Sequence, residues 1–241
     1  MMKRLLIALC LFINCLAGAQ TLDSMAWRQE KNTLMEQYLD EARNQALIYT
    51  GKEPQPYAPH ITNHPYFKSG LFTGGVLSYD GIRYPNVTLM FDSYRDQLIV
   101  LSPGTHSHLI LQSNKVDYAE MFGYRVIYFS PDGLKNSPSE GYYLLLYDGK
   151  CKVLEKQSCS LFETRKNEVR EGYFNKSSKY YVLKDGVYHM VKSKGSVLKI
   201  FEPHKRELNQ YSRQQQLNFR KETGNAIISI VKQYETFIQQ Q

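Results

Sequence analysis

The stretch GGVLSYDGIRYPNVTLMFDSYRDQLIV, from Gly74 to Val100, alternates apolar and polar residues on both sides of the dipeptide Asp80-Gly81. Alternation with a period of two is typical of strands that bury one face. Asp-Gly suits a two-residue type I′ turn, because both central positions of that turn need a positive φ. The stretch therefore predicts an antiparallel hairpin. Its tyrosines have two interpretations, cross-strand packing or a binding surface.

The same period continues outward through residues 71–201, punctuated by further Asp-Gly turns at residues 132–133, 148–149 and 185–186. Short turns between strands indicate antiparallel pairing. The expected strands are Gly75–Tyr79, Ile82–Phe91, Gln97–Leu101, Ser107–Leu111, Tyr124–Phe129, Tyr142–Tyr147, Lys150–Lys156, Ser160–Thr164, Lys179–Leu183, Val187–Lys192 and Ser196–Phe201. A sheet with this many strands must curl, close or stack on itself.

Helical spacing of apolar residues flanks this domain on both sides. Residues 20–50 predict an N-terminal helix, and residues 51–70, rich in proline, predict an extended linker or strap. Residues 202–241 predict two helices whose apolar stripes pack on the sheet. The fold class is therefore α+β, mostly antiparallel β in a curled sheet, roll or barrel, with one N-terminal and two C-terminal helices.

The first nineteen residues, MMKRLLIALCLFINCLAGA, have the pattern of a secretory signal peptide. Lys3 and Arg4 precede a short apolar run, and Ala17-Gly18-Ala19 supplies the small residues that signal peptidase reads. We therefore expect export, with cleavage before Gln20. No later segment has 18 consecutive apolar residues, so no transmembrane helix is expected after cleavage.

Positive charge is concentrated in the second half of the chain. The chain has 30 Lys and Arg against 23 Asp and Glu, a formal net charge of +7, and residues 150–241 hold 18 of those cations but only 9 of the anions. For an exported protein this favours an envelope protein, a glycan or an anionic lipid surface as partner rather than nucleic acid. Lys192, Lys194 and Lys199 form the candidate basic binding face. A merely solvated basic surface is the alternative.

Two cysteines remain after the expected cleavage, Cys151 and Cys159. They flank a predicted turn near Gln157-Ser158, so they are a candidate disulfide between adjacent strands in an oxidising compartment. Two unpaired thiols are the alternative, because a cross-strand bridge needs favourable Cβ placement. No cofactor motif and no recognised metal-ligand motif is present, so neither a cofactor nor a metal is expected.

Signatures of catalysis are weak throughout. Ser196-Val-Leu-Lys199 matches the SxxK pattern, but it falls in a predicted strand, whereas the chemistry needs a helical turn to bring lysine to serine. Asp92 and Asp96 flank a turn, and His106 and His108 share a strand face. A hydrolase whose acidic pair or histidines meet only in three dimensions therefore stays open as an alternative.

The stretch from Gly74 to Val100, together with YYLLLYDGKCKVLEK, YYVLKDGVYHMVKSKGSVLKIF and HKRELNQYSRQQQLNFRKETGNAIISIVKQYE, resembles a group of uncharacterised secreted proteins of Bacteroidota. The resemblance spans about residues 70–236 and implies a β-rich envelope protein in the periplasm or at the outer-membrane periphery. It implies no catalytic residue.

These observations together predict an exported cell-envelope protein that acts as a non-enzymatic binding or scaffold module. Export, the basic second half and the missing catalytic motifs support this interpretation. The envelope hydrolase is the first alternative. The second is a lipocalin-like carrier of a small ligand, which requires an apolar cavity inside a closed barrel.

Overall fold

The computed structural model describes residues 33–34, 47–131, 133–166 and 169–239. The chain divides into two units, Met1–Leu47 and Ile48–Gln241. The expected signal peptide and most of the expected N-terminal helix lie outside the described residues. The sheet and the C-terminal helices all belong to the second unit.

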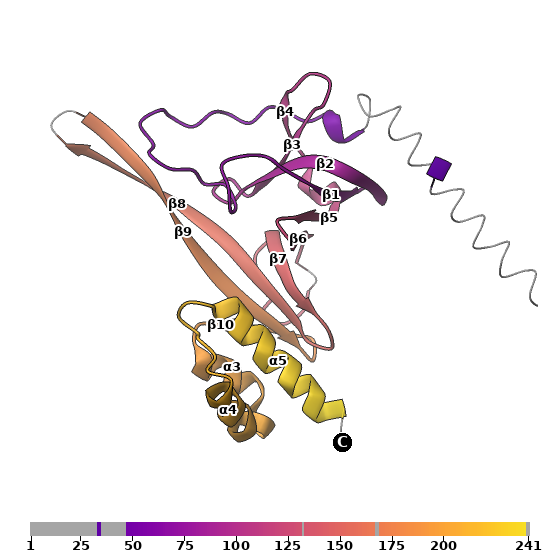
Figure 1. The fold of residues 1–241 in the computed structure, drawn as a ribbon, viewed down its shortest axis with the longest axis vertical. Helices are drawn as coiled ribbons and strands as arrows, with labels where there is room; N and C mark the ends of the chain where they lie inside the picture. The colour runs from indigo at the N-terminus through magenta and orange to yellow at the C-terminus, as the bar shows by residue number, and fades with distance from the viewer. Residues whose placement is uncertain (1–32, 35–46, 132, 167–168, 240–241) are drawn as a thin grey trace, which may run out of the picture. The chain divides into compact units, whose positions relative to one another are not determined.

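Among its described residues, the second unit has ten strands followed by three α-helices (Figure 1). The strands are β1 (Thr73–Tyr79), β2 (Ile82–Asp92), β3 (Gln97–Leu101), β4 (His108–Ile110), β5 (Val116–Met121), β6 (Tyr124–Phe129), β7 (Gly141–Asp148), β8 (Lys152–Lys166), β9 (Val169–Lys184) and β10 (Val187–Val191). The helices are α3 (Lys194–Ile200), α4 (Lys205–Gln214) and α5 (Thr223–Gln239). Short 3-10 turns occupy Leu47–Tyr49 (η1), Ser113–Lys115 (η2) and Glu202–His204 (η3).

All ten strands form one antiparallel sheet in the order β10-β9-β8-β7-β6-β5-β1-β2-β3-β4. The mostly antiparallel architecture is thus confirmed. The predicted turn chemistry holds at Asp80-Gly81, where both φ angles are positive at 55° and 74°. The sheet is open, with β10 and β4 as its edges, so the closed barrel that a lipocalin-like carrier requires is not formed.

Three expectations about individual elements were wrong. The strand expected at Ser196–Phe201 is the helix α3. The strands expected at Lys150–Lys156 and Ser160–Thr164 are one continuous strand, β8, so no turn lies near Gln157. Strand β5 was missed, because its hairpin to β6 turns at Phe122-Gly123 and phenylalanine is not a usual turn residue.

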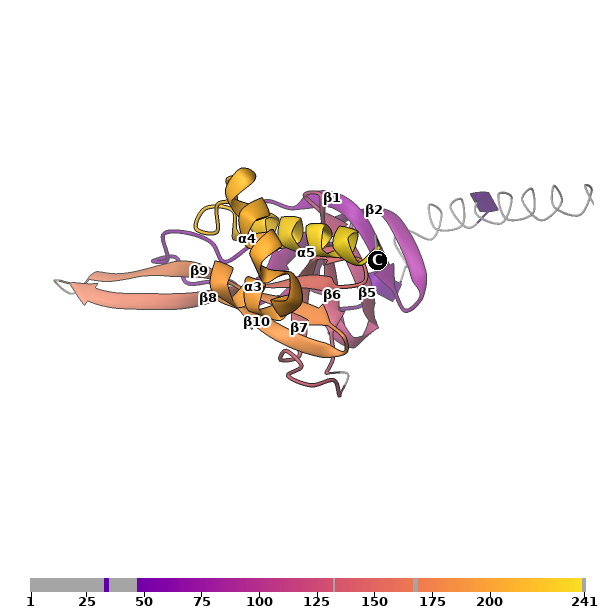
Figure 2. The ribbon, with the colours of Figure 1, turned by 90° about the horizontal axis from the view of Figure 1, so that it is seen from below.

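Strands β8 and β9 form a hairpin of fifteen paired positions, from Lys152–Leu183 to Lys166–Val169. Their neighbours are shorter: β7 pairs with β8 only as far as Glu155, and β10 pairs with β9 only as far as Tyr180. The outer part of the hairpin therefore projects beyond the sheet as a two-stranded arm (Figures 1 and 2).

The three helices pack on one face of the β8–β10 part of the sheet (Figure 2). Val153 and Val182 from the strands meet Ile227, Ile230 and Val231 of α5, and all five side chains are fully buried. The stripe predicted on the second C-terminal helix therefore does pack against the sheet. A separate aromatic cluster of Phe129, Tyr143, Leu154, Tyr181 and Tyr188 is also buried.

Residues 51–66 run as an extended strap, as their prolines predict. Near its start, Lys52 accepts a hydrogen bond from the Ile110 amide of β4. Farther along, Tyr57 packs edge-on against Phe174 of β9, with the ring centroids 5.0 Å apart. The strap therefore links the β4 end of the sheet to the arm.

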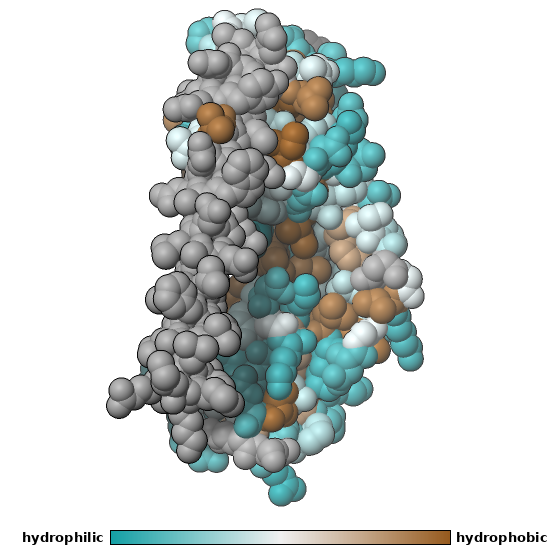
Figure 3. Space-filling model, turned by 90° about the vertical axis from the view of Figure 1, so that its right-hand side faces the viewer, coloured by the Kyte–Doolittle hydropathy of each residue, from teal (hydrophilic) through white to brown (hydrophobic). Residues whose placement is uncertain are grey.

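On the face drawn in Figure 3, apolar side chains gather in several small patches separated by hydrophilic ones. Scattered exposed apolar residues are ordinary on a protein surface, whereas a cluster with a defined geometry is informative. Two exposed aromatic side chains with a defined geometry occur on the arm: Phe162 and Tyr173 stack on each other and are 47% and 50% exposed.

Candidate functional site

A hollow of about 640 Å³ lies between the β6–β7 loop, strand β10 and helix α3. We call it the β10–α3 pocket. Its lining residues are Asn136, Ser137, Pro138, Ser139, Tyr181, Tyr188, His189, Met190, Ser196, Lys199 and Ile200. The volume falls in the range of small-molecule sites, and the lining combines apolar walls with a few polar groups, as such sites do.

Helix α3 exists because of a local capping arrangement. The Ser193 side chain accepts a hydrogen bond from the Ser196 amide, and the Ser196 side chain accepts one from the Ser193 amide. These reciprocal bonds satisfy amides that the first turn leaves without partners. Val197 and Leu198 are then buried in the helix–sheet core, and the sequence pattern alone did not distinguish this short buried helix from a strand.

The helix brings Ser196 and Lys199, the SxxK pair, to the same pocket wall. The objection that this segment is a strand is therefore removed. The Ser196 hydroxyl, however, donates to the Ser193 carbonyl at 2.7 Å and accepts from the amides of Lys192 and Ser193 at 3.0 and 2.9 Å. Because its proton and lone pairs already serve the helix cap, this hydroxyl is poorly suited to act as a nucleophile.

The polar groups of the pocket give it positive charge. Lys199 is exposed, and no carboxylate of the described residues lies within ion-pair distance of its ammonium. Burial lowers the pKa of His189 below its usual 6.5, and the nearby Lys184 lowers it further. His189 is therefore neutral at pH 7 and offers one donor and one acceptor beside a single cationic group.

The apolar wall of the β10–α3 pocket comes from two tyrosines of the buried aromatic cluster. Tyr181 and Tyr188 are nearly buried, and Met190 beside them is 45% exposed. Burial raises the pKa of Tyr181, so its phenol stays neutral. The pocket therefore has an apolar surface beside a lysine ammonium.

The structure does not bring the three predicted basic residues together. Lys199 lines the β10–α3 pocket. Lys194, five residues earlier on α3, lines a different hollow beside Arg213 and Leu217. Lys192 is exposed after the end of β10 and lines neither. Because five helical residues turn by about 140°, lysines at that spacing cannot share one face. The candidate basic face is thus reduced to Lys199.

The candidate disulfide is not formed. Cys151 and Cys159 are both unpaired. Cys151 directly precedes β8 and Cys159 lies within it, so eight extended residues separate them by about 26 Å. A disulfide needs Cα atoms less than about 7 Å apart. The disulfide prediction failed because it assumed a turn between the cysteines, where the structure has one continuous strand.

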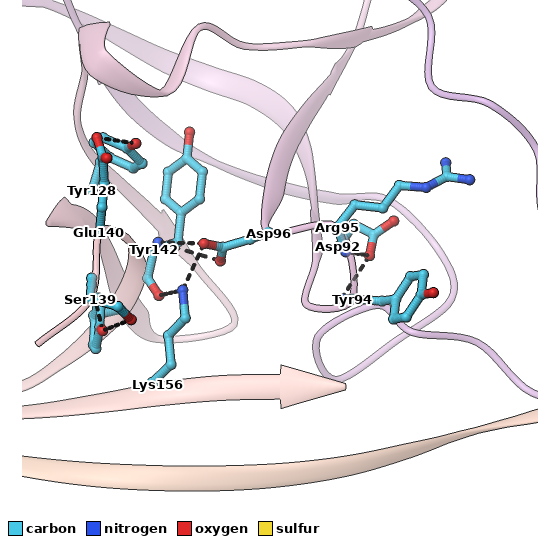
Figure 4. A network of polar contacts seen from close by, with 10 residues as sticks. Asp92, Tyr94, Arg95, Asp96, Tyr128, Ser139, Glu140, Tyr142 and Lys156 are labelled. Carbon is cyan, nitrogen blue, oxygen red and sulfur yellow. Dashed lines mark hydrogen bonds and ion pairs between the residues drawn. The ribbon is translucent and has the colours of Figure 1, made fainter. Parts of the chain in front are cut away.

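The acidic residues of the β2–β3 turn hold the fold together (Figure 4). Asp92 is buried and accepts hydrogen bonds from the Tyr57 hydroxyl at 2.6 Å and from the Tyr94 amide at 2.9 Å. Asp96 forms an ion pair of 2.7 Å with Lys156, whose ammonium also donates to the Tyr142 carbonyl. Both carboxylates are engaged with the protein itself, which leaves the acidic pair of the hydrolase alternative without support.

His106 and His108, expected on one strand face, have different backbone environments. His106 has a positive φ of 57° in the β3–β4 turn. His108 is the first residue of β4, and its ring packs against the Phe72 ring, with the two ring centroids 4.7 Å apart. No group of three metal-ligating side chains occurs within the described residues. Among those residues there is likewise no helix with the length and apolarity that crossing a membrane requires.

Sequence reasoning missed most of this pocket. It placed Tyr181, Tyr188 and Lys199 in or beside strands, but it gave no reason to join them to residues 136–139. The pocket forms because the β6–β7 loop reaches the β10 edge, where the Tyr188 amide donates a hydrogen bond to the Lys135 carbonyl at 3.0 Å. No local sequence signal encodes that contact. Comparison of the chain with protein-family models, curated proteins and solved structures gives no match.

Proposed function

We propose that this chain is an exported cell-envelope protein that binds a small anionic, partly apolar ligand in the β10–α3 pocket and performs no chemistry on it. The observation that carries the proposal is the exposed Lys199 ammonium beside an apolar wall of Tyr181 and Tyr188 in a hollow of about 640 Å³. A carboxylate, phosphate or sulfonate group fits the lysine, and an aromatic or aliphatic body fits the tyrosines.

Binding without catalysis is the better interpretation because of Ser196. The hydrolase alternative would rest on Ser196 and Lys199, the two residues of the pocket that match a catalytic pattern. The serine hydroxyl is bonded to three backbone groups of the helix cap, so activating it would break the start of α3. The lysine is left as a group that attracts charge.

The ligand class can be tested with 8-anilinonaphthalene-1-sulfonate, a fluorescent anion with an aromatic body. We expect saturable binding, and we expect Lys199→Glu to weaken it about tenfold, the effect of losing one charge-assisted hydrogen bond. Lys192→Glu is the matched control, because it makes the same charge change on an exposed lysine outside the pocket. Fluorescence titration at fixed ionic strength measures both affinities.

Equal weakening by both variants would show that the probe responds to net charge, and would contradict a site at Lys199. Unchanged binding in Lys199→Glu would contradict it as well. A neutral analogue without the sulfonate should bind more weakly than the anion to the unchanged protein, and should lose no affinity in Lys199→Glu.

Location in the envelope belongs to the same proposal and rests on the residues before Gln20. Mass spectrometry of the protein recovered from an exporting cell should give a chain that begins at Gln20. A chain that retains Met1 and stays in the cytoplasm would contradict the proposed location, whereas the titration above tests the pocket independently.

A further inference from the structure

The arm of the β8–β9 hairpin has two edges outside the main sheet. It comprises Lys156–Lys166 of β8 and Val169–Lys179 of β9, which pair only with each other in the ladder. A two-stranded ribbon in water has unpaired backbone groups along both sides, and such edges are sites of strand addition unless something covers them.

The β9 edge of the arm is covered by the strap. The Gly172 amide donates to the His60 carbonyl at 3.1 Å, and the Gly172 carbonyl accepts from the Thr62 amide at 2.9 Å. The Asn63 side chain then bonds both backbone groups of Phe174, accepting from its amide at 2.6 Å and donating to its carbonyl at 2.8 Å. The strap thus satisfies this edge over two successive outward-facing residues.

Within the part of the chain that the structure describes, no segment covers the β8 edge in this way. Since Gly172 and Phe174 direct their backbone groups to the strap, their partners Glu163 and Leu161 form non-hydrogen-bonded pairs with them. The backbone N–H and C=O groups of Glu163 and Leu161 must therefore point away from β9. Because this direction alternates along a strand, the backbone groups of Cys159 and Arg165 also point away from β9. None of these groups has a hydrogen-bond partner among the described residues.

The protein covers its other sheet edges. Lys52 of the strap bonds the Ile110 amide on β4, and Lys135 of the β6–β7 loop bonds the Tyr188 amide on β10. Those strands are also short, with three and five residues. The β8 edge, by contrast, runs from Lys156 to Lys166 without a proline, and its outward backbone groups have no partner among the described residues, so a strand can add there.

An exposed aromatic pair lies on one face of this edge. Phe162 and Tyr173 oppose each other across the arm, with ring centroids 5.6 Å apart and planes 16° from parallel. Each is about half exposed. Phe162 belongs to β8 itself, so a strand added at that edge would lie against its ring.

We infer that two copies of this chain associate by antiparallel pairing of their β8 edges, around a two-fold axis at Phe162. In this register Phe162 faces its own copy, and the rings form a ladder in the order Tyr173, Phe162, Phe162, Tyr173. Such a self-complementary patch is what a two-fold contact requires. Ser160 then faces Thr164, and Leu161 faces Glu163.

Neighbouring registers are less favourable. An axis at Glu163 would set two carboxylates directly opposite each other, and like charges in that position are destabilising. An axis at Leu161 would set Ser160 opposite Phe162 and divide the aromatic ladder. The axis at Phe162 has no pair of like charges from Cys159 to Arg165, and it joins all four rings.

Sedimentation of the purified chain over a concentration series tests the association. We expect a monomer–dimer equilibrium, and we expect Phe162→Lys to raise its dissociation constant at least about tenfold, since the substitution places two ammonium groups opposite each other. Leu71→Lys is the control, because it also replaces an exposed apolar side chain with lysine, at a residue that is 76% exposed and lies outside the arm. It should alter the dissociation constant less than about twofold. Circular dichroism verifies that both variants are folded.

Disulfide trapping tests the register, in a background where Cys10, Cys15 and Cys159 are serine. A mixture of Ser160→Cys and Thr164→Cys chains should cross-link, because those positions face each other across the axis. A mixture of Ser158→Cys and Thr164→Cys chains, which face each other only with an axis at Leu161, should not. A monomer at every concentration, a dimer that Phe162→Lys leaves intact, or cross-linking in the second mixture alone would each overturn the inference. Pairing of the edge only with an added heterologous peptide would do so too.

Discussion

At the scale of single residues, Glu235 shows how a buried charge is used for structure. It lies on α5, is 7% exposed, and accepts hydrogen bonds from the Cys151 amide and the Tyr147 hydroxyl, each at 2.7 Å. The carboxylate raises the pKa of Tyr147 to about 12, so the phenol remains a donor. Glu235 therefore fastens α5 to the β7–β8 turn.

We expect Glu235→Ala to lower the free energy of unfolding by about 2–4 kcal/mol, because it removes both bonds and leaves a buried amide unsatisfied. Glu235→Gln keeps an acceptor and should cost less than half as much. Urea denaturation measures both, with the adjacent exposed Thr236→Ala as control. Equal losses for alanine and glutamine would show that a neutral acceptor does not replace the carboxylate at this position.

At the scale of elements, prediction from the sequence succeeded where the signal was local. β3 and β6 were predicted to the residue, and the hairpin at Asp80-Gly81 has the expected positive φ angles. It failed where distant contacts decide. The polar run from Gln157 to Ser160 resembled a turn, but pairing along β9 keeps it extended. The pocket depends on a loop-to-edge contact that no local pattern encodes.

The strap offers an element-scale prediction. Asn63→Ala should leave the amide of Phe174 without its acceptor, while the strap's own backbone bonds to Gly172 remain. We expect hydrogen exchange at Phe174 to accelerate at least about tenfold, which corresponds to about 1.4 kcal/mol. Asn175→Ala, on the exposed strand position next to it, is the control. Unchanged protection of Phe174 would show that Asn63 does not guard this edge.

At the scale of the whole folded unit, one continuous sheet carries buried side chains in separate regions. The helices cover Val153 and Val182, whereas Leu98 of β3 is fully buried outside that helix-packed cluster. Two ties join these regions: the Asp96–Lys156 ion pair, which links the β2–β3 turn to β8, and the packing of Tyr57 on Phe174. Such ties make independent unfolding of either region costly.

The unit from Ile48 onward should therefore unfold in one cooperative transition. Ile230→Ala, at a fully buried position of α5, should cost about 2–4 kcal/mol from lost burial and the cavity left behind. If unfolding is cooperative, slow hydrogen exchange at Leu98 in β3 should lose protection by the same free energy as exchange in α5, although Leu98 is outside the helix-packed cluster. Asp96→Asn should weaken this coupling. Loss of protection confined to α5 would instead show that the ion pair and the strap do not join the two regions.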